Sequence, residues 1–517
     1  MKRSLGILLS TGLVISLMAG CSGGTSGESA ASDAGSKGDL GSASAQAENN
    51  GEYEHLTLVL SLNGTEPADK DMVAEEISKI TREKIGAEVE LKYISGSAYA
   101  DQMNLMISSE EDVDLVYTSA SANNTTMATN GAFYELNDLL EQYGSGIIDA
   151  VGQEVIDACA IDGKIYLIPT VKETAQGAAI GARADIMEEL GVAPEDIHTM
   201  DDFEELLRKV KEAYPDMIPY LPGGNIESAI GLTVLNGKDR LVDSMGVITD
   251  LTGENTKLEN IFVSEEYKEF VERMHRWYEE GLIGADVLTQ VNEISSLNQA
   301  GRLFSSANLQ KPDQAKIMTQ NAGYEMCVLT FDDVPCISDT NTLMATTYAI
   351  PYYAKNPQKS MELLNLMYSD ADIANLLGLG IEGTHYVLND DGTASFANGL
   401  TTTTTGYYYY QQIPAIGNEF LVHPWEGNDP DIWEQYEEFN ASGIVSCARG
   451  FVFDSSPVKT QYAAVKNVFD EFRPSLEYGV ADPETVLPEF LEKLEKAGLS
   501  DVIKEKQAQF DAWRGAQ

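Results

Sequence analysis

The stretch Leu56-Thr57-Leu58-Val59-Leu60 opens the pattern that decides the fold of this chain. It is rich in apolar and β-branched residues, so we predict a buried strand that breaks at Asn63-Gly64-Thr65. Apolar residues then recur at helical spacing over Asp69–Lys84, which predicts an amphipathic helix. Gly86 follows, in the position of a glycine that ends a helix.

Strands and helices continue to alternate after this first helix. Val89–Ile94 and Asp114–Tyr117 are predicted as strands, with a helix from Tyr99 through Ile107 between them. The order strand, helix, strand, helix, strand is typical of a parallel sheet with crossover helices. We therefore predict an α/β fold.

The N-terminus carries a secretory signal. Lys2 and Arg3 precede the apolar run Leu5–Leu17, which is too short to span a membrane. The run ends in Leu17-Met18-Ala19-Gly20-Cys21, which resembles a bacterial lipobox except that Met18 stands where leucine is usual. The resemblance implies that residues 1–20 are removed and that Cys21 is lipidated. An ordinary signal peptide with an incidental cysteine is the alternative.

Residues 21–53 contain mainly Gly, Ser, Ala, Asp and Glu, with almost nothing to bury. Such a segment cannot offset the entropy of ordering, so we predict a flexible linker between a lipid anchor and a globular body. We expect the body to lie outside the cell, held at the outer face of the cytoplasmic membrane by the lipid alone.

Composition limits the partners of this body. Its hydrophobic fraction of 43% is that of a globular protein, and its length favours two or more lobes. The net charge of −48 excludes nucleic acid as a partner and favours a neutral or cationic ligand, although a solvated acidic surface explains it equally well.

No cofactor or metal site is predicted. The five histidines lack metal-like spacing, and Cys159, Cys327, Cys336 and Cys447 lack zinc-like spacing. Cys327 and Cys336 are close enough in sequence to pair, and we leave that question open. Gly378–Gly383 matches a dinucleotide-binding pattern but follows a helix instead of a strand, and residues 389–392 are better read as a hairpin turn than as a calcium loop.

Short polar residues follow the predicted strands at the edge where ligands bind in parallel sheets. Asn63, Thr65 and Glu66 follow the first strand, and Ser119 and Asn123 follow the third. They have no nucleophile and base nearby, so recognition of hydroxyl groups suits them better than chemistry. Their alternative role is to form turns.

Longer motifs resemble a known family. Gly131–Leu140 and the turn Asp162–Pro169 resemble segments of the family 1 extracellular solute-binding proteins of ABC importers. Arg183–Gly191 resembles the segment after that family's first crossing between lobes, and Asn341–Pro351 resembles its return. Further stretches resemble a lipoprotein branch of LipO and YtcQ type, whose closing segment is a domain of unknown function: Gly380–Tyr386, Ile416–Phe420, Gly450–Lys459 and Leu487–Trp513.

This resemblance implies a periplasmic-binding-protein-like fold, with two α/β lobes joined by hinge strands and a ligand cleft between them. Carried over, lobe 1 comprises residues 54–180 and 331–380, lobe 2 comprises 181–330 and 381–445, and 446–517 pack on the lobes. The implied function is to bind a carbohydrate, usually an oligosaccharide, by lobe closure and to deliver it to ABC permease subunits. We expect a monomer.

Aromatic residues outside a core period are candidates for stacking on sugar. Four consecutive tyrosines, residues 407–410, cannot all face one core, so we select Tyr407, Tyr408 and Tyr409 as ligand contacts. Trp425 lies in a loop rich in Pro and Gly, where we expect exposure. Asn308 is a further candidate, in a loop after Gly301-Arg302-Leu303-Phe304. Trp277 and Trp433 have helix-like surroundings and are predicted to be packing residues.

Two other functions remain open at this stage. A surface glycoside hydrolase would need two carboxylates, which 82 acidic residues could supply. A peptide-binding or sensory lipoprotein of the same fold is the third possibility.

Overall fold

The structure is a computed structural model that describes residues 53–223 and 231–515. The compact unit Tyr53–Gln517 begins at the predicted end of the linker. The predicted signal peptide, Cys21 and the predicted linker up to residue 52 lie outside the described residues. Among the helices that are described, none is long and apolar enough to cross a membrane.

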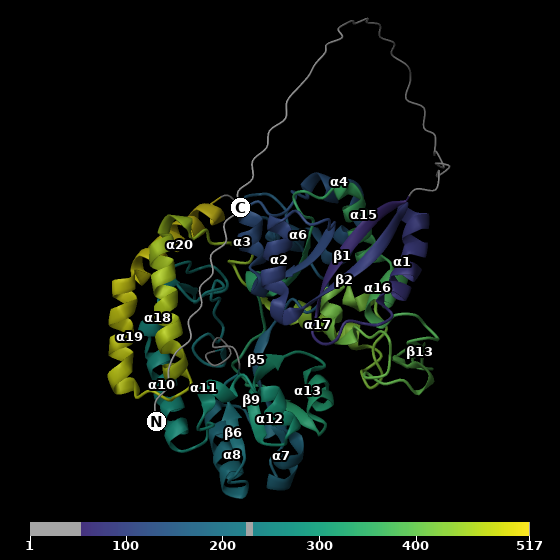
Figure 1. Ribbon diagram of the computed structural model, residues 1–517. Helices are drawn as coiled ribbons and strands as arrows, with labels where there is room; N and C mark the ends of the chain where they lie inside the picture. The colour runs from purple at the N-terminus through teal and green to yellow at the C-terminus, as the bar shows by residue number, and fades with distance from the viewer. Residues whose placement is uncertain (1–52, 224–230, 516–517) are drawn as a thin grey trace, which may run out of the picture. The chain divides into compact units, whose positions relative to one another are not determined.

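The predicted alternation builds the first sheet, whose strand order is β2-β1-β3-β12-β4 (Figure 1). Its members are β1 (Glu54–Leu62), β2 (Ala87–Ser95), β3 (Leu115–Ser119), β12 (Thr346–Ala349) and β4 (Ile168–Pro169). β1 runs parallel to β2 and β3, which confirms the predicted parallel sheet. β12 runs antiparallel to β3 and β4, a feature that the local sequence pattern did not predict.

The two predicted crossover helices are also confirmed. α1 (Lys70–Ile85) ends at Gly86, whose φ of 67° is left-handed and whose N–H donates to the carbonyl of Thr81. α2 spans Tyr99–Ser108. Further helices pack around the same core: α3 (Asn124–Thr129), α4 (Asn137–Tyr143), α5 (Ser145–Val151), α6 (Gln153–Ala158), α15 (Pro357–Ser369) and α16 (Ala371–Leu379). We call this sheet, with the residues packed in its core, the first lobe.

A second sheet has the order β10-β5-β9-β6. It consists of β5 (Gly177–Arg183), β6 (Ile218–Leu221), β9 (Leu303–Gln310) and β10 (Met326–Leu329). Around it lie α7 (Ala184–Leu190), α8 (Met200–Ala213), α10 (Glu265–Glu279), α11 (Val287–Gln290), α12 (Ile294–Gln299) and α13 (Gln314–Ala322). Trp277 is fully buried here against Phe203 and Tyr220, which confirms it as a packing residue. We call this sheet and its core the second lobe.

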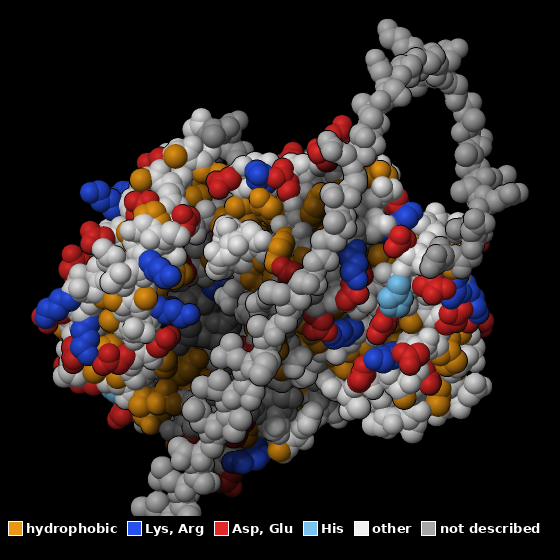
Figure 2. Space-filling view, turned by 45° about the horizontal axis from the view of Figure 1, so that its top comes forward, with side chains coloured by type: hydrophobic (Ala, Val, Ile, Leu, Met, Phe, Trp, Pro, Cys, Tyr) orange, Lys and Arg blue, Asp and Glu red, His pale blue; other side chains and the backbone are white. Residues whose placement is uncertain are grey.

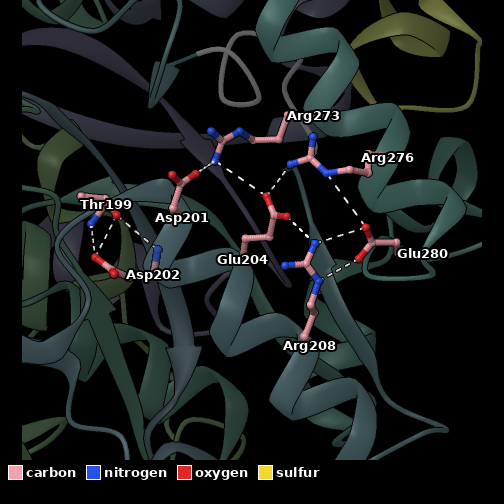
Figure 3. Close-up of polar contacts among 8 residues, drawn as sticks. All are labelled: Thr199, Asp201, Asp202, Glu204, Arg208, Arg273, Arg276 and Glu280. Atoms are coloured by element: carbon pink, nitrogen blue, oxygen red, sulfur yellow. Dashed lines mark hydrogen bonds and ion pairs between the residues drawn. The ribbon is translucent and has the colours of Figure 1, made fainter.

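A charged network joins α8 to α10 on the second lobe (Figure 3). Thr199 caps α8 by accepting from the N–H of Asp202. The buried Glu204 accepts hydrogen bonds from Arg208 and from Arg276, the latter at 2.7 Å. Burial opposes ionisation of Glu204, but its hydrogen bonds and the nearby Arg276 charge outweigh this and lower its pKa.

The C-terminal helices pack on the second lobe. α18 (Lys459–Glu477), α19 (Pro483–Ala497) and α20 (Leu499–Arg514) bury apolar residues in its core. A small third cluster joins Ala448, Phe451 and Phe510 to Leu241, Ile248 and Leu258. The hairpin of β7 (Val247–Ile248) and β8 (Leu258–Glu259) supplies part of that cluster.

Residues 386–425 belong to the first lobe, whereas we expected 381–445 in the second. The hairpin of β13 (Tyr386–Leu388) and β14 (Ala394–Phe396) and the segment after it bury Tyr386, Ala394, Ile413 and Ile416 in the first core. Residues 389–392 form the turn of this hairpin, as predicted. The expectation was wrong because the family pattern fixes the order of segments and not the core that each one faces.

Charge is spread over the surface. Figure 2 shows Asp and Glu side chains scattered over the visible face with Lys and Arg among them. Cys327 and Cys336 are separate free thiols, which answers the question of pairing for this structure. Burial raises the pKa of both thiols, that of Cys327 to about 12.

Candidate ligand-binding site

The chain crosses between the two sheets through three segments that are hydrogen-bonded side by side. Gln176 lies on the first crossing, β11 (Ile337–Ser338) on the second and β15 (Ile444–Val445) on the third. Gln176 and Ile337 exchange two main-chain hydrogen bonds of 2.9 and 2.8 Å, and β11 pairs in parallel with β15. We call these residues the hinge ribbon. A narrow ribbon between two packed cores is where a hinge would absorb rotation.

A cavity of about 180 Å³ borders the hinge ribbon. Amide, hydroxyl and charged side chains line it, among them Gln176, Lys238, Asn308, Asn341 and Thr342. Side chains of this kind can both donate to and accept from hydroxyl groups. This cavity therefore combines hinge residues with hydrogen-bonding groups of the second lobe.

Asn308 lies inside strand β9 and not in a loop, so that part of its prediction is wrong. The strand continues to Gln310 because Ser305–Gln310 pair with β5. The Oδ1 atom of Asn308 accepts from Gln314 at 2.7 Å. Asn308 also lines a second cavity of about 220 Å³ between α12 and α13, together with Ser295, Asn298 and Asn321.

The predicted polar residues of the first lobe share one edge of the first sheet. The parallel register places Leu58 beside Leu115, so Asn63 and Ser119 follow neighbouring strand ends. Asn63, Thr65, Glu66 and Asn123 are exposed, and Ser119 is buried. Their position beyond the carboxyl ends agrees with the prediction, and their contact with a ligand stays a prediction.

Hydrogen bonds fix part of this edge of the first sheet. The N–H of Asn63 donates to the side-chain oxygen of Gln412 at 2.9 Å, and the hydroxyls of Ser119 and Ser121 lie 2.9 Å apart. Glu66 pairs with Lys70, the first residue of α1. Gln412 was not predicted, because it lies 349 residues from Asn63 and only the fold brings them together.

Tyr407 and Tyr409 are core residues, each 1% exposed. The hydroxyl of Tyr409 donates to the carbonyl of Ser61 at 2.5 Å, and that of Tyr407 donates to the carbonyl of Leu377 at 2.9 Å. Tyr408 and Tyr410 are half-buried and pack on the same first core. The four rings do not all face the core, as predicted, because this irregular segment turns inward at alternate residues. Two of the three selected rings, Tyr407 and Tyr409, are however the inward ones.

Trp425 is also buried, at 6% exposure, where the sequence led us to expect an exposed ring. Its ring packs against Phe396, Tyr408 and Tyr410, with centroids 4.7, 5.0 and 5.7 Å away. The loop is held in place because the N–H of Glu426 donates to the carbonyl of Ala394 in β14. A contact of Trp425 with ligand stays a prediction, but this conformation leaves more aromatic surface on Tyr408 and Tyr410.

Trp433 lies in α17 (Ile432–Ser442) and packs as predicted. Its ring stacks on Phe420 at 5.5 Å, and its indole N–H donates to the carbonyl of Val422 at 2.7 Å.

Buried charges accompany the first crossing. Lys172 and Glu173 form an ion pair of 2.9 Å, and both side chains are almost fully buried. Burial favours a neutral Glu173, but the charges of Lys172 and Lys311 prevail and lower its pKa. Burial and the neighbouring Glu173 raise the pKa of Glu419 well above its ordinary value. The pKa values of these two neighbouring carboxyl groups are therefore shifted in opposite directions.

No metal centre accompanies these groups. Within residues 53–223 and 231–515, no three His, Cys, Asp or Glu side chains are grouped to hold a metal ion.

Two mixed sheets, each packed with helices, are joined by the three segments of the hinge ribbon. This arrangement defines the class of protein, a two-lobed binding protein. Comparison with known proteins supports this class. Residues 76–382, more than half of the chain, match the bacterial extracellular solute-binding protein family, and residues 447–515 match a domain of unknown function, DUF3502. The chain belongs to the bacterial extracellular solute-binding protein family.

Individual relatives agree with this assignment. A carbohydrate ABC transporter substrate-binding protein of Streptococcus pneumoniae is 24% identical over 458 residues, which cover 87% of this chain and 89% of the relative. Lipoprotein LipO of Bacillus subtilis is 28% identical over 235 residues, 44% of each chain.

Solved structures show the same fold. The N-glycan transport solute-binding protein NgtS of Streptococcus pneumoniae has a TM-score of 0.77 and 24% identity, over 89% of this chain and 98% of NgtS. The alginate-binding protein AlgQ2 has a TM-score of 0.61 and 17% identity, over 89% of this chain and 99% of AlgQ2.

Proposed function

We propose that this protein is the substrate-binding component of an ABC importer and that it binds a carbohydrate, in particular an oligosaccharide. The observation that carries the proposal is the hinge ribbon, which has hydrogen-bonding side chains on both lobes and a cavity beside it. The relatives support the ligand class. NgtS was solved with Man1GlcNAc and with Man5GlcNAc, and the pneumococcal relative is a carbohydrate transporter component.

The mechanism that follows is closure of the two lobes around the ligand. A ligand stabilises the closed arrangement only by its difference in affinity for the two states. A sugar that bonds to Asn308 on the second lobe and to Asn63 or Asn123 on the first would supply that difference, because only closure lets it reach both lobes.

The chemistry of the candidate groups suits a sugar. Amide side chains such as Asn308 and Asn341 offer one donor group and one acceptor each, which matches a hydroxyl group. The half-buried rings of Tyr408 and Tyr410 offer faces for the C–H side of a pyranose. The acidic surface adds a preference for neutral over anionic glycans.

The same proposal includes the anchor. Lipidation of Cys21 would hold a monomeric receptor at the outer face of the cytoplasmic membrane, within reach of the permease subunits. Replacement Cys21→Ala should release the protein from the membrane fraction into the medium. Retention of the variant in the membrane fraction would contradict the lipid anchor.

The ligand class is tested by calorimetry on the chain from Ser22 onward, titrated with Man1GlcNAc, Man5GlcNAc, further neutral oligosaccharides and a peptide set. Binding of one glycan series, recovered uncut, supports the proposal. Binding of peptides alone would overturn the sugar assignment, and cleavage of the glycan would favour a glycoside hydrolase.

A matched pair of variants tests the site. Asn308→Ala removes an amide at the hinge cavity, and we expect roughly three- to tenfold weaker glycan binding, the equivalent of about one hydrogen bond. Asn104→Ala removes an exposed amide of α2 and should leave affinity unchanged. Equal affinities of the two variants would remove Asn308 from the site.

A further inference from the structure

The C-terminal region, residues 447–515, contacts both lobes. Its helices are part of the second core: Phe469 and Phe472 of α18 and Phe490 of α19 pack there with Phe262 of the second lobe. Lys506 of α20 is fully buried and pairs with Asp243 of the same lobe. The region must therefore move with the second lobe when the lobes rotate.

Its first residues reach the other lobe. Arg449 donates to Glu154 of α6 at 2.6 Å, and its side chain also lies 3.5 Å from Ser338 of the hinge ribbon. α6 belongs to the first lobe, because Ile156 and the following Cys159 are fully buried in the first core. One cation therefore connects the C-terminal region, the hinge and the first lobe.

Gly450 makes the closest approach. A Cβ atom built on it would lie 2.9 Å from the carbonyl oxygen of Ala158, the last residue of α6, so backbone packs on backbone there. Its N–H donates at 2.8 Å to the hydroxyl of Thr340, which in turn donates to the carbonyl of Ala448. Thr340 begins α14 (Thr340–Leu343) on the second crossing.

The segment that contains Arg449 and Gly450 cannot bend away from α6. Ala448 and Phe451, on either side of Arg449 and Gly450, are buried in the third cluster with Phe510 of α20. β15 of the hinge ribbon ends at Val445, only four residues before Arg449. Rotation about the hinge ribbon must therefore change the distance between Gly450 and α6.

Beside the contact of Gly450 with α6, the surfaces of the C-terminal region and of the first lobe separate. A cavity of about 800 Å³ opens between the turn at Asp162 and the side chains of Asp454, Gln509 and Trp513. The C-terminal region is thus pressed against the first lobe at Arg449 and Gly450, with open space beside the contact.

We propose that the C-terminal region is a brace: it is carried by the second lobe and, through Arg449 and Gly450, limits how far the first lobe can turn about the hinge ribbon. This role concerns a region whose function the family assignment leaves unknown, and it does not depend on which ligand is bound. A brace narrows the range of conformations that the ligand-free protein can adopt.

The test compares two glycines with nearly the same φ angle. Gly450→Ala, at φ 101°, places a methyl group against Ala158, whereas Gly246→Ala, at φ 98°, meets only side-chain atoms at 3.4 Å or more within the second lobe and α20. Both variants carry the strain of a positive φ, so both should lose stability to urea. Only Gly450→Ala should alter the relation between the lobes.

The readout is the distance between nitroxides clicked onto azido amino acids at positions 79 and 209, which are exposed on α1 and α8. It is measured by pulsed EPR on the chain from Ser22 onward without added glycan. We expect a shifted distribution for Gly450→Ala and a broadened one for Arg449→Ala, with Gly246→Ala as in the wild type.

The brace is overturned if Gly450→Ala and Arg449→Ala both keep the wild-type distribution. Should Gly450→Ala fail to fold, Arg449→Ala alone decides: the Arg449 side chain is only 11% exposed, but it belongs to none of the three apolar clusters, so its removal leaves the cores intact. The experiment contains no sugar, so its failure is separate from a failure of the carbohydrate proposal.

Discussion

A fully buried ion pair secures the C-terminal region to the second lobe. Arg473 and Glu477 lie one turn apart on α18, with side chains only 3% and 0% exposed. The guanidinium Nε atom donates to Glu477 at 2.7 Å, and the hydroxyl of Tyr267 on α10 donates to the same carboxylate at 3.0 Å. The guanidinium also lies over Phe262 and Phe469.

Glu477→Gln should destabilise the protein strongly. The variant keeps the side-chain size and opens no cavity, but it leaves the buried guanidinium without this counter-charge. Removal of one partner of a buried pair costs about 3–5 kcal/mol. Because a glutamine oxygen can still accept one hydrogen bond, we expect the lower end, about 3 kcal/mol, which is roughly a hundredfold in the unfolding equilibrium.

Urea unfolding followed by intrinsic fluorescence measures this cost, with a control on the same helix. Glu471→Gln removes an exposed carboxylate that pairs with Lys493 at 2.8 Å, and exposed pairs contribute less than about 1 kcal/mol. Glu477→Gln should lower the midpoint clearly more than Glu471→Gln. Equal midpoints for the two variants would refute the claim that the buried pair secures this helix.

Three further predictions concern the second lobe and its junction with the hinge. Burial and the charge of Asp339 raise the pKa of Asp239 to about 6, so the contribution of Asp239 to stability is present below about pH 4 and is lost as the pH rises through 6. Urea midpoints of Asp239→Asn should therefore improve relative to the wild type between pH 4 and 7, and a constant difference would contradict this. Glu204→Gln should lower the free energy of unfolding by about 1–2 kcal/mol, measured by urea unfolding, since Arg208 and Arg276 are half-exposed and can be hydrated. A loss as large as that of Glu477→Gln would show that the network of Figure 3 is more buried than described. Trp277→Ala should cost about 3–5 kcal/mol in the same assay because it empties the aromatic cluster with Phe203 and Tyr220, and a neutral effect would remove Trp277 from the core.

Local sequence predicted the first sheet well. The strands around Leu58, Leu91 and Val116 and the helices between them formed within a few residues of their predicted bounds, because alternation and helical spacing report which side of a segment is apolar. The helix end at Gly86 was predicted for the same local reason. The carboxyl edge with Asn63 and Ser119 then followed from the parallel order of the strands.

The site was predicted only in part. The sequence selected Tyr407, Tyr409 and Trp425 by their irregular setting, and all three are buried. Residues 401–428 have no regular period, so nothing local shows which ring turns inward; contacts such as that of Tyr409 with Ser61, 348 residues away, decide it. Gln412 and the hinge residues were missed for the same reason.

The sequence by itself determined the class of fold and the order of the segments, and it predicts an export signal, because these depend on local pattern and motif. Only the tertiary structure decided that residues 386–425 complete the first core, that Gln176, Ile337 and Ile444 lie side by side, and that Gly450 meets Ala158. The physical reason is that periodicity shows which face of a helix or strand must be buried. The partner that buries this face is decided by packing between segments distant in the chain.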